Sequence, residues 1–138
     1  MLNILLVEDN EVNVKLVEEA LKKIEHPVVL ESVQDGAEAI NFITKKEPYE
    51  NVFKPQIILL DKNMPKVNGL EFLTFIKKEE ALSKIPVLMF TTSTNPKDYE
   101  TCYELGVNTY FVKPIKFDQY VDLLDKIIGY WSQAQFGH

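Results

Sequence analysis

Short apolar segments alternate with stretches of helical period along the whole chain. Several of these segments lack the apolar–polar alternation of a half-exposed strand, and uninterrupted apolar runs are typical of a parallel sheet covered on both faces. The strands predicted from them cover residues 2–7, 28–33, 57–60, 87–90 and 109–112.

The remaining stretches carry apolar residues at the three- and four-residue spacing of an amphipathic helix. The last of them, from Phe117 to Trp131, shows this spacing most clearly. Asn10 and Asp35 are good N-cap residues, Asn95-Pro96 is typical of a helix start, and Gly106 is typical of a helix end. The predicted helices cover residues 11–24, 36–46, 69–78, 97–105 and 117–131.

Five strand–helix units in succession predict an α/β fold with one doubly wound, five-stranded parallel sheet. Right-handed crossover connections place helices on both faces of such a sheet. The length of 138 residues favours one domain over two. We expect residues 1–131 to form this domain and residues 132–138 to form a short tail.

Charge and composition exclude several classes of function. The formal net charge is -6 and Lys and Arg form no block, whereas nucleic-acid binding needs a basic footprint. No apolar run approaches the ~20 residues of a membrane span, and the N-terminus lacks the basic lead of a signal peptide. Cys102 is the only cysteine, so no intrachain disulfide can form. We therefore expect a cytoplasmic protein that binds neither nucleic acid nor a membrane.

Polar residues follow the predicted strands, and those after the first, third, fourth and fifth strands are candidates for a site. In an open α/β sheet, ligands bind outside the carboxyl ends of the strands. Glu8 and Asp9 follow the first strand, Asp61 the third, Thr91 and Thr92 the fourth, and Lys113 the fifth. Three acids, two hydroxyls and a lysine are therefore predicted to converge on one edge of the sheet.

Each of these residues has an ordinary alternative role, since an acid at a strand end is usually a helix cap or a solvated charge. Asp61 fits that role least, because it directly follows an apolar run. Carboxylates within ~4 Å repel by up to ~4 kcal/mol at an effective dielectric of 20, so a cluster of them recruits a cation. Oxygen ligands favour Mg²⁺. With Mg²⁺ present, Asp61 can act as a nucleophile on phosphorus, and Lys113 and Thr91 would hold the transferred oxygens.

Four segments, LLVEDN, LLDKNMPKVNG, IPVLMFTTS and YFVKP, resemble the receiver domains of two-component response regulators in their order and spacing. The resemblance covers essentially the whole chain and implies a flavodoxin-like sheet with strand order 2-1-3-4-5. The segments PVLMFTTS and YELGVN, and a last helix ending in Tyr130-Trp131, resemble one subgroup. Members of this subgroup are stand-alone regulators that often pair with phytochrome-type or other hybrid histidine kinases.

The resemblance implies that Asp61 is the phosphoacceptor, which takes a phosphoryl group from a histidine kinase or a phosphotransfer protein. It also implies a Mg²⁺ site. Asp9 and Asp61 would bind the ion directly, Glu8 would bind it through water, and the backbone carbonyl of Asn63 would be a further ligand.

The same resemblance assigns a switch. Thr91 would move to the phosphoryl group, Lys113 would pair with a phosphoryl oxygen, and both would assist Asp61 in the reaction. Tyr110 would be the aromatic residue that turns inward on activation. A cis bond between Lys113 and Pro114 would aim the lysine into the site, although only ~5–6% of X–Pro bonds in folded proteins are cis.

Three other functions fit the pattern less well. A phosphatase of the haloacid-dehalogenase type needs a second Asp two residues after the nucleophile, where this chain has Asn63. A flavodoxin-like cofactor carrier needs a hydroxyl- and Gly-rich phosphate loop, which here reads Glu8-Asp9-Asn10. A degenerate receiver is disfavoured because every position of the site holds a competent residue. We expect no enzyme activity beyond the chain's own phosphorylation and dephosphorylation.

No DNA-binding or enzymatic output segment is recognisable, so the signal is expected to leave through contacts with other proteins. The predicted output surface is the face built by the fourth helix, the fifth strand and the fifth helix, which would support a homodimer by analogy with the stand-alone subgroup. This face also carries six aromatic residues, which are Tyr99, Tyr103, Phe111, Phe117, Tyr120 and Trp131. The alternative is that most of these six side chains belong to the core.

Overall fold

The structure is a computed structural model that describes residues 1–61 and 69–137, apart from the side chain of Asp61. Strands and helices alternate through these residues, as the sequence predicts. The strands are β1 (Leu2–Val7), β2 (Val28–Val33), β3 (Ile57–Asp61), β4 (Val87–Thr91) and β5 (Thr109–Val112), and the helices are α1 (Glu11–Lys22), α2 (Gly36–Ile43), α3 (Gly69–Lys78), α4 (Pro96–Glu104) and α5 (Phe117–Ser132).

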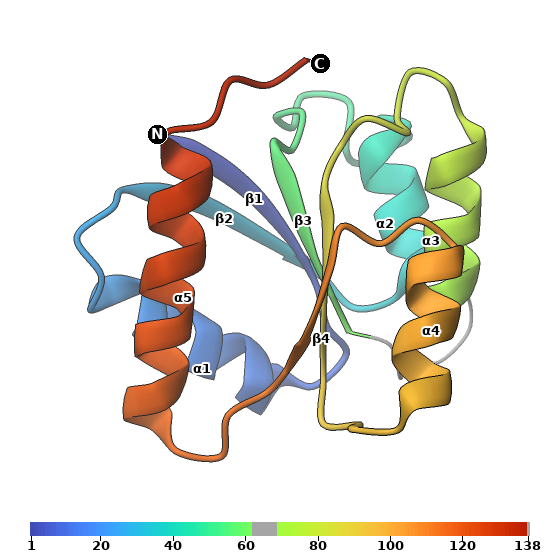
Figure 1. The fold of residues 1–138 in the computed structure, drawn as a ribbon. Helices are drawn as coiled ribbons and strands as arrows, with labels where there is room; N and C mark the ends of the chain where they lie inside the picture. The colour runs from blue at the N-terminus through green and yellow to red at the C-terminus, as the bar shows by residue number, and fades with distance from the viewer. Residues whose placement is uncertain (62–68, 138) are drawn as a thin grey trace.

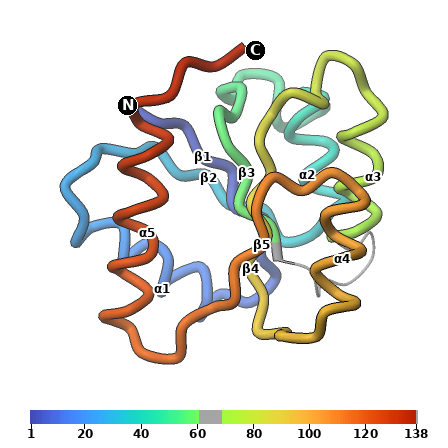
Figure 2. The backbone as a smooth tube through the Cα atoms, in the orientation of Figure 1, coloured from blue at the N-terminus to red at the C-terminus, as the bar shows by residue number. Residues whose placement is uncertain are grey.

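The strands form one parallel sheet in the order β2-β1-β3-β4-β5. Helices α1 and α5 cover one face of the sheet, and α2, α3 and α4 cover the other (Figure 1). The predicted fold class and strand order are therefore confirmed. Both chain ends lie at the amino edge of the sheet, opposite the edge at which the strands end (Figure 2).

The predicted strand bounds are confirmed for β1, β2 and β5, whereas β3 and β4 each extend one residue further, to Asp61 and Thr91. Helix α2 ends at Ile43, three residues before its predicted end. The Thr44 hydroxyl donates to the Ile40 carbonyl at 2.7 Å, and Lys45 takes a left-handed φ of 58°, which a helix cannot continue through.

The helix caps follow the sequence signals. The Asn10 side chain accepts hydrogen bonds from two N–H groups of the first turn of α1, and the Asp35 side chain accepts one from Glu38. Asn95 caps α4, with Pro96 at the first helical position. Gly106, just after α4, has a φ of 100°, a conformation that glycine adopts without a steric cost. These caps fix where the loops at the sheet edge leave their helices.

Each face of the sheet packs against its own apolar cluster, because successive strand residues point to opposite faces. Leu5 and Ile58 belong to the cluster under α2, α3 and α4. Ile4 and Leu59 belong to the cluster under α1 and α5. These four side chains are essentially inaccessible to solvent, as expected of a sheet covered on both faces. In the part of the chain that the structure describes, no helix is long and apolar enough to cross a membrane.

Candidate functional site

The residues predicted to carry the chemistry lie at the carboxyl edge of the sheet. Asp61 ends β3, the middle strand, which lies between β1 and β4. Glu8 and Asp9 follow β1, Thr91 ends β4, and Lys113 follows β5. Because all the strands are parallel, these five backbone positions come together at one edge, as the sequence predicts.

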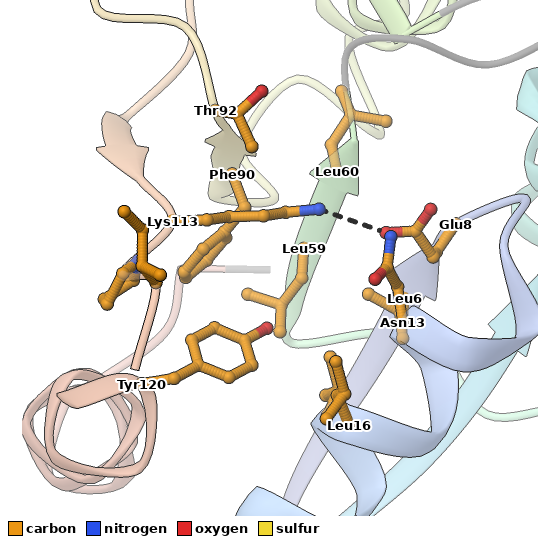
Figure 3. Close-up of a pocket in the computed structure, with 13 residues that line it drawn as sticks. Leu6, Glu8, Asn13, Leu16, Leu59, Leu60, Phe90, Thr92, Lys113 and Tyr120 are labelled. Carbon is orange, nitrogen blue, oxygen red and sulfur yellow. Dashed lines mark hydrogen bonds and ion pairs between the residues drawn. The ribbon is translucent and has the colours of Figure 1, made fainter. Parts of the chain in front are cut away.

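Glu8 and Lys113 form a buried ion pair across this edge. The Lys113 ammonium lies 3.3 Å from one Glu8 carboxylate oxygen (Figure 3), and the Asn10 N–H donates to the other oxygen at 3.3 Å. The Glu8 side chain is 3% exposed and that of Lys113 is 21% exposed. The backbone N–H of Lys113 donates to the Thr91 carbonyl at 2.8 Å, and this hydrogen bond fixes the position of the Lys113 backbone beside β4. The lysine therefore offsets a buried negative charge in this state of the protein.

The two acids after β1 fit an oxygen-binding divalent cation. Glu8 is buried and Asp9 is exposed beside it, so one carboxylate is shielded from water and the other is open to it. Within residues 1–61 and 69–137, no three His, Cys, Asp or Glu side chains form a metal-binding group. Of the other predicted ligands, the side chain of Asp61 and the whole of Asn63 lie outside the described residues.

Thr91, the predicted switch hydroxyl, is buried at the end of β4 with 2% of its surface exposed. Its oxygen accepts a hydrogen bond from the Ser93 N–H at 3.2 Å. A hydroxyl has one donor hydrogen and two acceptor lone pairs. This contact uses an acceptor position and leaves the donor hydrogen for another oxygen.

Tyr110, the predicted switch aromatic, is half-buried and packs against the cluster under α2, α3 and α4. Its hydroxyl donates to the Ser93 carbonyl at 3.0 Å, and its backbone N–H donates to the Tyr103 hydroxyl at 3.0 Å. Its ring meets the Tyr99 ring edge-on, with centroids 5.7 Å apart. The loop before α4 and the helix itself therefore both hold Tyr110.

The six aromatic residues predicted on the output surface differ in their exposure to solvent. Only Tyr99 and Tyr103 are well exposed, at 38% and 48%. The other four are half-buried and pack against the cluster under α1 and α5, as the core interpretation expects. They are Phe111, Phe117, Tyr120 and Trp131.

A cavity of about 200 Å³, which was not predicted from the sequence, lies beside the Glu8–Lys113 pair (Figure 3). Its walls are mainly apolar and come from β1, α1, β3, β4 and α5, and from the loop before α5, where the fully exposed Ile115 lines it. Tyr120 reaches into it from α5. Burial, and to a lesser extent the charge of Glu8, raise the pKa of the Tyr120 hydroxyl well above its ordinary value.

The prediction of a cis bond between Lys113 and Pro114 is wrong for this structure. Among the described residues the cis peptide bond is Glu47–Pro48. The trans form of an X–Pro bond is favoured by about 0.5–1 kcal/mol. With the Lys113–Pro114 bond in the trans form, the Lys113 ammonium still reaches Glu8.

The chain matches a known family over most of its length. A family model described as the response regulator receiver domain matches residues 4–125. The chain belongs to this family. Receiver domains are signalling proteins of two-component systems, they are phosphorylated on an aspartate, and they bind a divalent metal.

Individual relatives agree with this assignment. The response regulator Rcp1 of Synechocystis sp. is 39% identical over 133 residues, which cover 95% of this chain and 89% of that protein. The structure of the phosphorylated cyanobacterial phytochrome response regulator RcpA matches with a TM-score of 0.91 and 36% identity, over 99% of this chain and 98% of that one. The Mn²⁺-bound form of Rcp1 matches with a TM-score of 0.89 and 36% identity, over 100% of each chain. The predicted resemblance to phytochrome response regulators is confirmed.

Proposed function

We propose that this chain is a cytoplasmic response regulator that accepts a phosphoryl group on Asp61 from a histidine kinase or a phosphotransfer protein. The observation that carries the proposal is the position of Asp61. It ends the middle strand at the edge where Glu8, Thr91 and Lys113 converge. In this proposal residues 1–131 are the receiver domain, residues 132–138 are a tail, and the signal leaves through phosphorylation-dependent protein contacts.

The proposed reaction transfers the phosphoryl group between two proteins. A carboxylate oxygen of Asp61 forms a bond to phosphorus while the bond from phosphorus to an imidazole nitrogen of the donor breaks. Lys113 then leaves Glu8 for a phosphoryl oxygen, and the Thr91 hydroxyl donates to another. Charge-assisted hydrogen bonds of this kind are stronger than neutral ones, so the phosphoryl group can draw both side chains toward it.

We propose Mg²⁺ as the divalent ion of this site. When bound, it neutralises charge on the acids and on the phosphoryl oxygens. Glu8 (through water), Asp9, Asp61 and the backbone carbonyl of Asn63 would hold it. The pairing of Glu8 with Lys113 supports this arrangement, because a buried carboxylate is stable only with a positive charge or hydrogen-bond donors nearby.

The proposed function is tested by the intact mass of the protein after incubation with acetyl phosphate. We expect a phosphate-sized gain with Mg²⁺ and none when a chelator is present. In Asp9→Ala, the affinity for Mg²⁺ measured by calorimetry should fall by more than roughly tenfold, the loss typical even of outer partners of metal ligands.

Asp118→Ala is the matched control, because Asp118 is an exposed acid in the first turn of α5. It should bind Mg²⁺ as the unmodified chain does. A near-normal Mg²⁺ affinity in Asp9→Ala would remove Asp9 from the site, and phosphorylation in the presence of chelator would contradict the metal requirement.

We further propose that the face of α4, β5 and α5 carries the output, through a homodimer or another protein. Exposed apolar and aromatic side chains on these elements support it, because such groups favour association. The exposed side chains are Tyr99, Tyr103, Val112 and Tyr130. A hollow between β5 and α5, lined by Phe111, Lys126 and Tyr130 among others, would receive a partner's side chain.

Sedimentation with and without beryllofluoride, a mimic of the phosphoryl group, tests this surface. We expect the mimic to promote association and Tyr110→Ala to weaken that response, because Tyr110 packs against Tyr99 of α4. Val12→Ala is the control, since Val12 is an exposed apolar residue on α1. If neither the mimic nor Tyr110→Ala changes the oligomeric state or the affinity for a partner, this face does not carry the output.

A further inference from the structure

Ser93 lies in the loop between β4 and α4 and forms hydrogen bonds with four other residues. Its N–H donates to the Thr91 hydroxyl at 3.2 Å, and its carbonyl accepts from the Tyr110 hydroxyl at 3.0 Å. Its side-chain oxygen accepts from the Asn95 N–H at 3.2 Å and donates its hydrogen to the Asp98 carboxylate. The N–H, the carbonyl and the hydroxyl of this serine are thus all engaged, and the hydroxyl has two of the four partners.

Two of these partners are the residues to which the proposed function assigns the switch. Thr91 ends β4 and Tyr110 lies in β5, and both contact the backbone of Ser93 from opposite ends of the residue. Asp98 lies in the first turn of α4, where a carboxylate is favoured by the helix dipole. Ser93 therefore connects both switch residues to the start of α4.

We propose that Ser93 and Asp98 form a latch that makes the β4–α4 loop, the Tyr110 side chain and the first turn of α4 move as one unit. The proposal rests on the proposed function, in which Thr91 responds to the phosphoryl group. Ser93 and Asp98 act as positioning residues, since their role is to transmit the movement of Thr91. The surface of α4 then changes whenever the switch changes.

The hydrogen-bond chemistry of Thr91 allows such transmission. The Ser93 N–H occupies an acceptor position of the Thr91 hydroxyl, so the hydroxyl can donate its hydrogen to a phosphoryl oxygen without losing Ser93. If Thr91 shifts toward the phosphoryl group, Ser93 therefore moves with it. Asp98 and Tyr110 then move as well, because they are hydrogen-bonded to the hydroxyl and the carbonyl of Ser93.

Among the hydrogen bonds of Ser93, the one to Asp98 is expected to contribute most to the stability of the latch. A hydrogen bond to a charged group changes an equilibrium by roughly tenfold or more, whereas a neutral one changes it severalfold. Removing the Ser93 hydroxyl should therefore loosen the first turn of α4 without removing any backbone contact to Thr91 or Tyr110.

The first experiment uses the unphosphorylated protein, so its result does not depend on phosphorylation. In Ser93→Ala, amide hydrogen exchange in the first turn of α4 should accelerate by roughly tenfold, and the NMR signals of the Tyr110 ring should shift. Ser93→Thr keeps the hydroxyl and should restore both. Ser83→Ala is the matched control, because the Ser83 hydroxyl makes a local bond to the Glu80 carbonyl at 3.2 Å.

Asp98→Ala removes the latch from the side of the helix. If Ser93 and Asp98 act as one interaction, the double variant should exchange no faster than the faster single variant. Additive effects of the two substitutions would overturn the latch, because the two residues would then act independently. Unchanged exchange in α4 together with unchanged Tyr110 signals in Ser93→Ala would overturn it as well.

The second experiment adds beryllofluoride and Mg²⁺ and follows the same signals. In the unmodified protein both Tyr110 and the first turn of α4 should respond, whereas in Ser93→Ala the response of α4 should be largely lost. An equal response of α4 in both proteins would overturn the latch. If the unmodified protein does not respond at all, the proposed function fails, while the exchange of the unphosphorylated variants still decides the latch.

Discussion

Replacing Asp61 with asparagine should abolish the phosphate-sized mass gain that acetyl phosphate and Mg²⁺ produce. The substitution keeps the size of the side chain but removes the carboxylate oxygen that would bond to phosphorus. Asp61 is the last residue of the middle strand, and the backbones of Glu8, Thr91 and Lys113 lie at the same edge. We therefore expect complete loss of the modification. Intact-mass spectrometry after a fixed incubation measures it.

Asp118→Asn makes the same chemical change at an exposed position of α5 and serves as the control. It should gain phosphate at the rate of the unmodified chain. If Asp61→Asn gains phosphate at the normal rate, Asp61 is not the phosphoacceptor. A folded variant, shown by an unchanged circular dichroism spectrum and melting temperature, excludes the alternative that the loss reflects unfolding.

The fold could be predicted from the sequence because buried parallel strands are uniformly apolar. This signal placed the buried strands β1, β3 and β4 to within one residue, and the cap residues Asn10 and Asp35 placed the helix starts. The ends of helices were predicted less well. Helix α2 stops at Ile43 because Lys45 takes a left-handed conformation, and nothing in the local apolar spacing reports that.

The positions of the site residues followed from one rule, that ligands bind at the carboxyl ends of parallel strands. That rule places backbones but not side chains. It did not show that Lys113 extends to Glu8, or that Ser93 and Asp98 are joined across a loop. These contacts depend on side-chain rotamers and on loop geometry. The signal that would have suggested the second is a serine two residues before the N-cap Asn95.

The aromatic residues show a different limit of sequence patterns. A helical stripe indicates that one face of a helix is apolar, but it does not say which side of the sheet that face packs against. Tyr120 and Trp131 lie on such a stripe in α5 and pack into the cluster it shares with α1. The exposed aromatic area on the proposed output face is consequently smaller than the sequence suggests, and on α4 it consists of Tyr99 and Tyr103.

Replacing Lys113 with methionine should have the second large effect, because it removes the cation that lies 3.3 Å from buried Glu8. Breaking a buried ion pair from one side typically costs about 3–5 kcal/mol, and the partial exposure of Lys113 reduces this to about 2–3 kcal/mol. Methionine retains much of the apolar length of lysine, so the loss reports mainly the charge. The free energy of unfolding in urea, measured without divalent ions, gives the value.

Glu8→Gln in the same chain separates the charge from the packing. If the cost in Lys113→Met comes from an uncompensated carboxylate at Glu8, the double variant should recover most of the stability. Mg²⁺ should also recover part of the stability of Lys113→Met, because an ion that binds the folded state stabilises it by mass action.

The single variant Lys113→Met should bind beryllofluoride about ten- to hundredfold more weakly than the unmodified protein, since a charge-assisted hydrogen bond to the mimic is lost. A Lys113→Met protein of normal stability and normal beryllofluoride affinity would show that Lys113 neither balances Glu8 nor contacts the phosphoryl group.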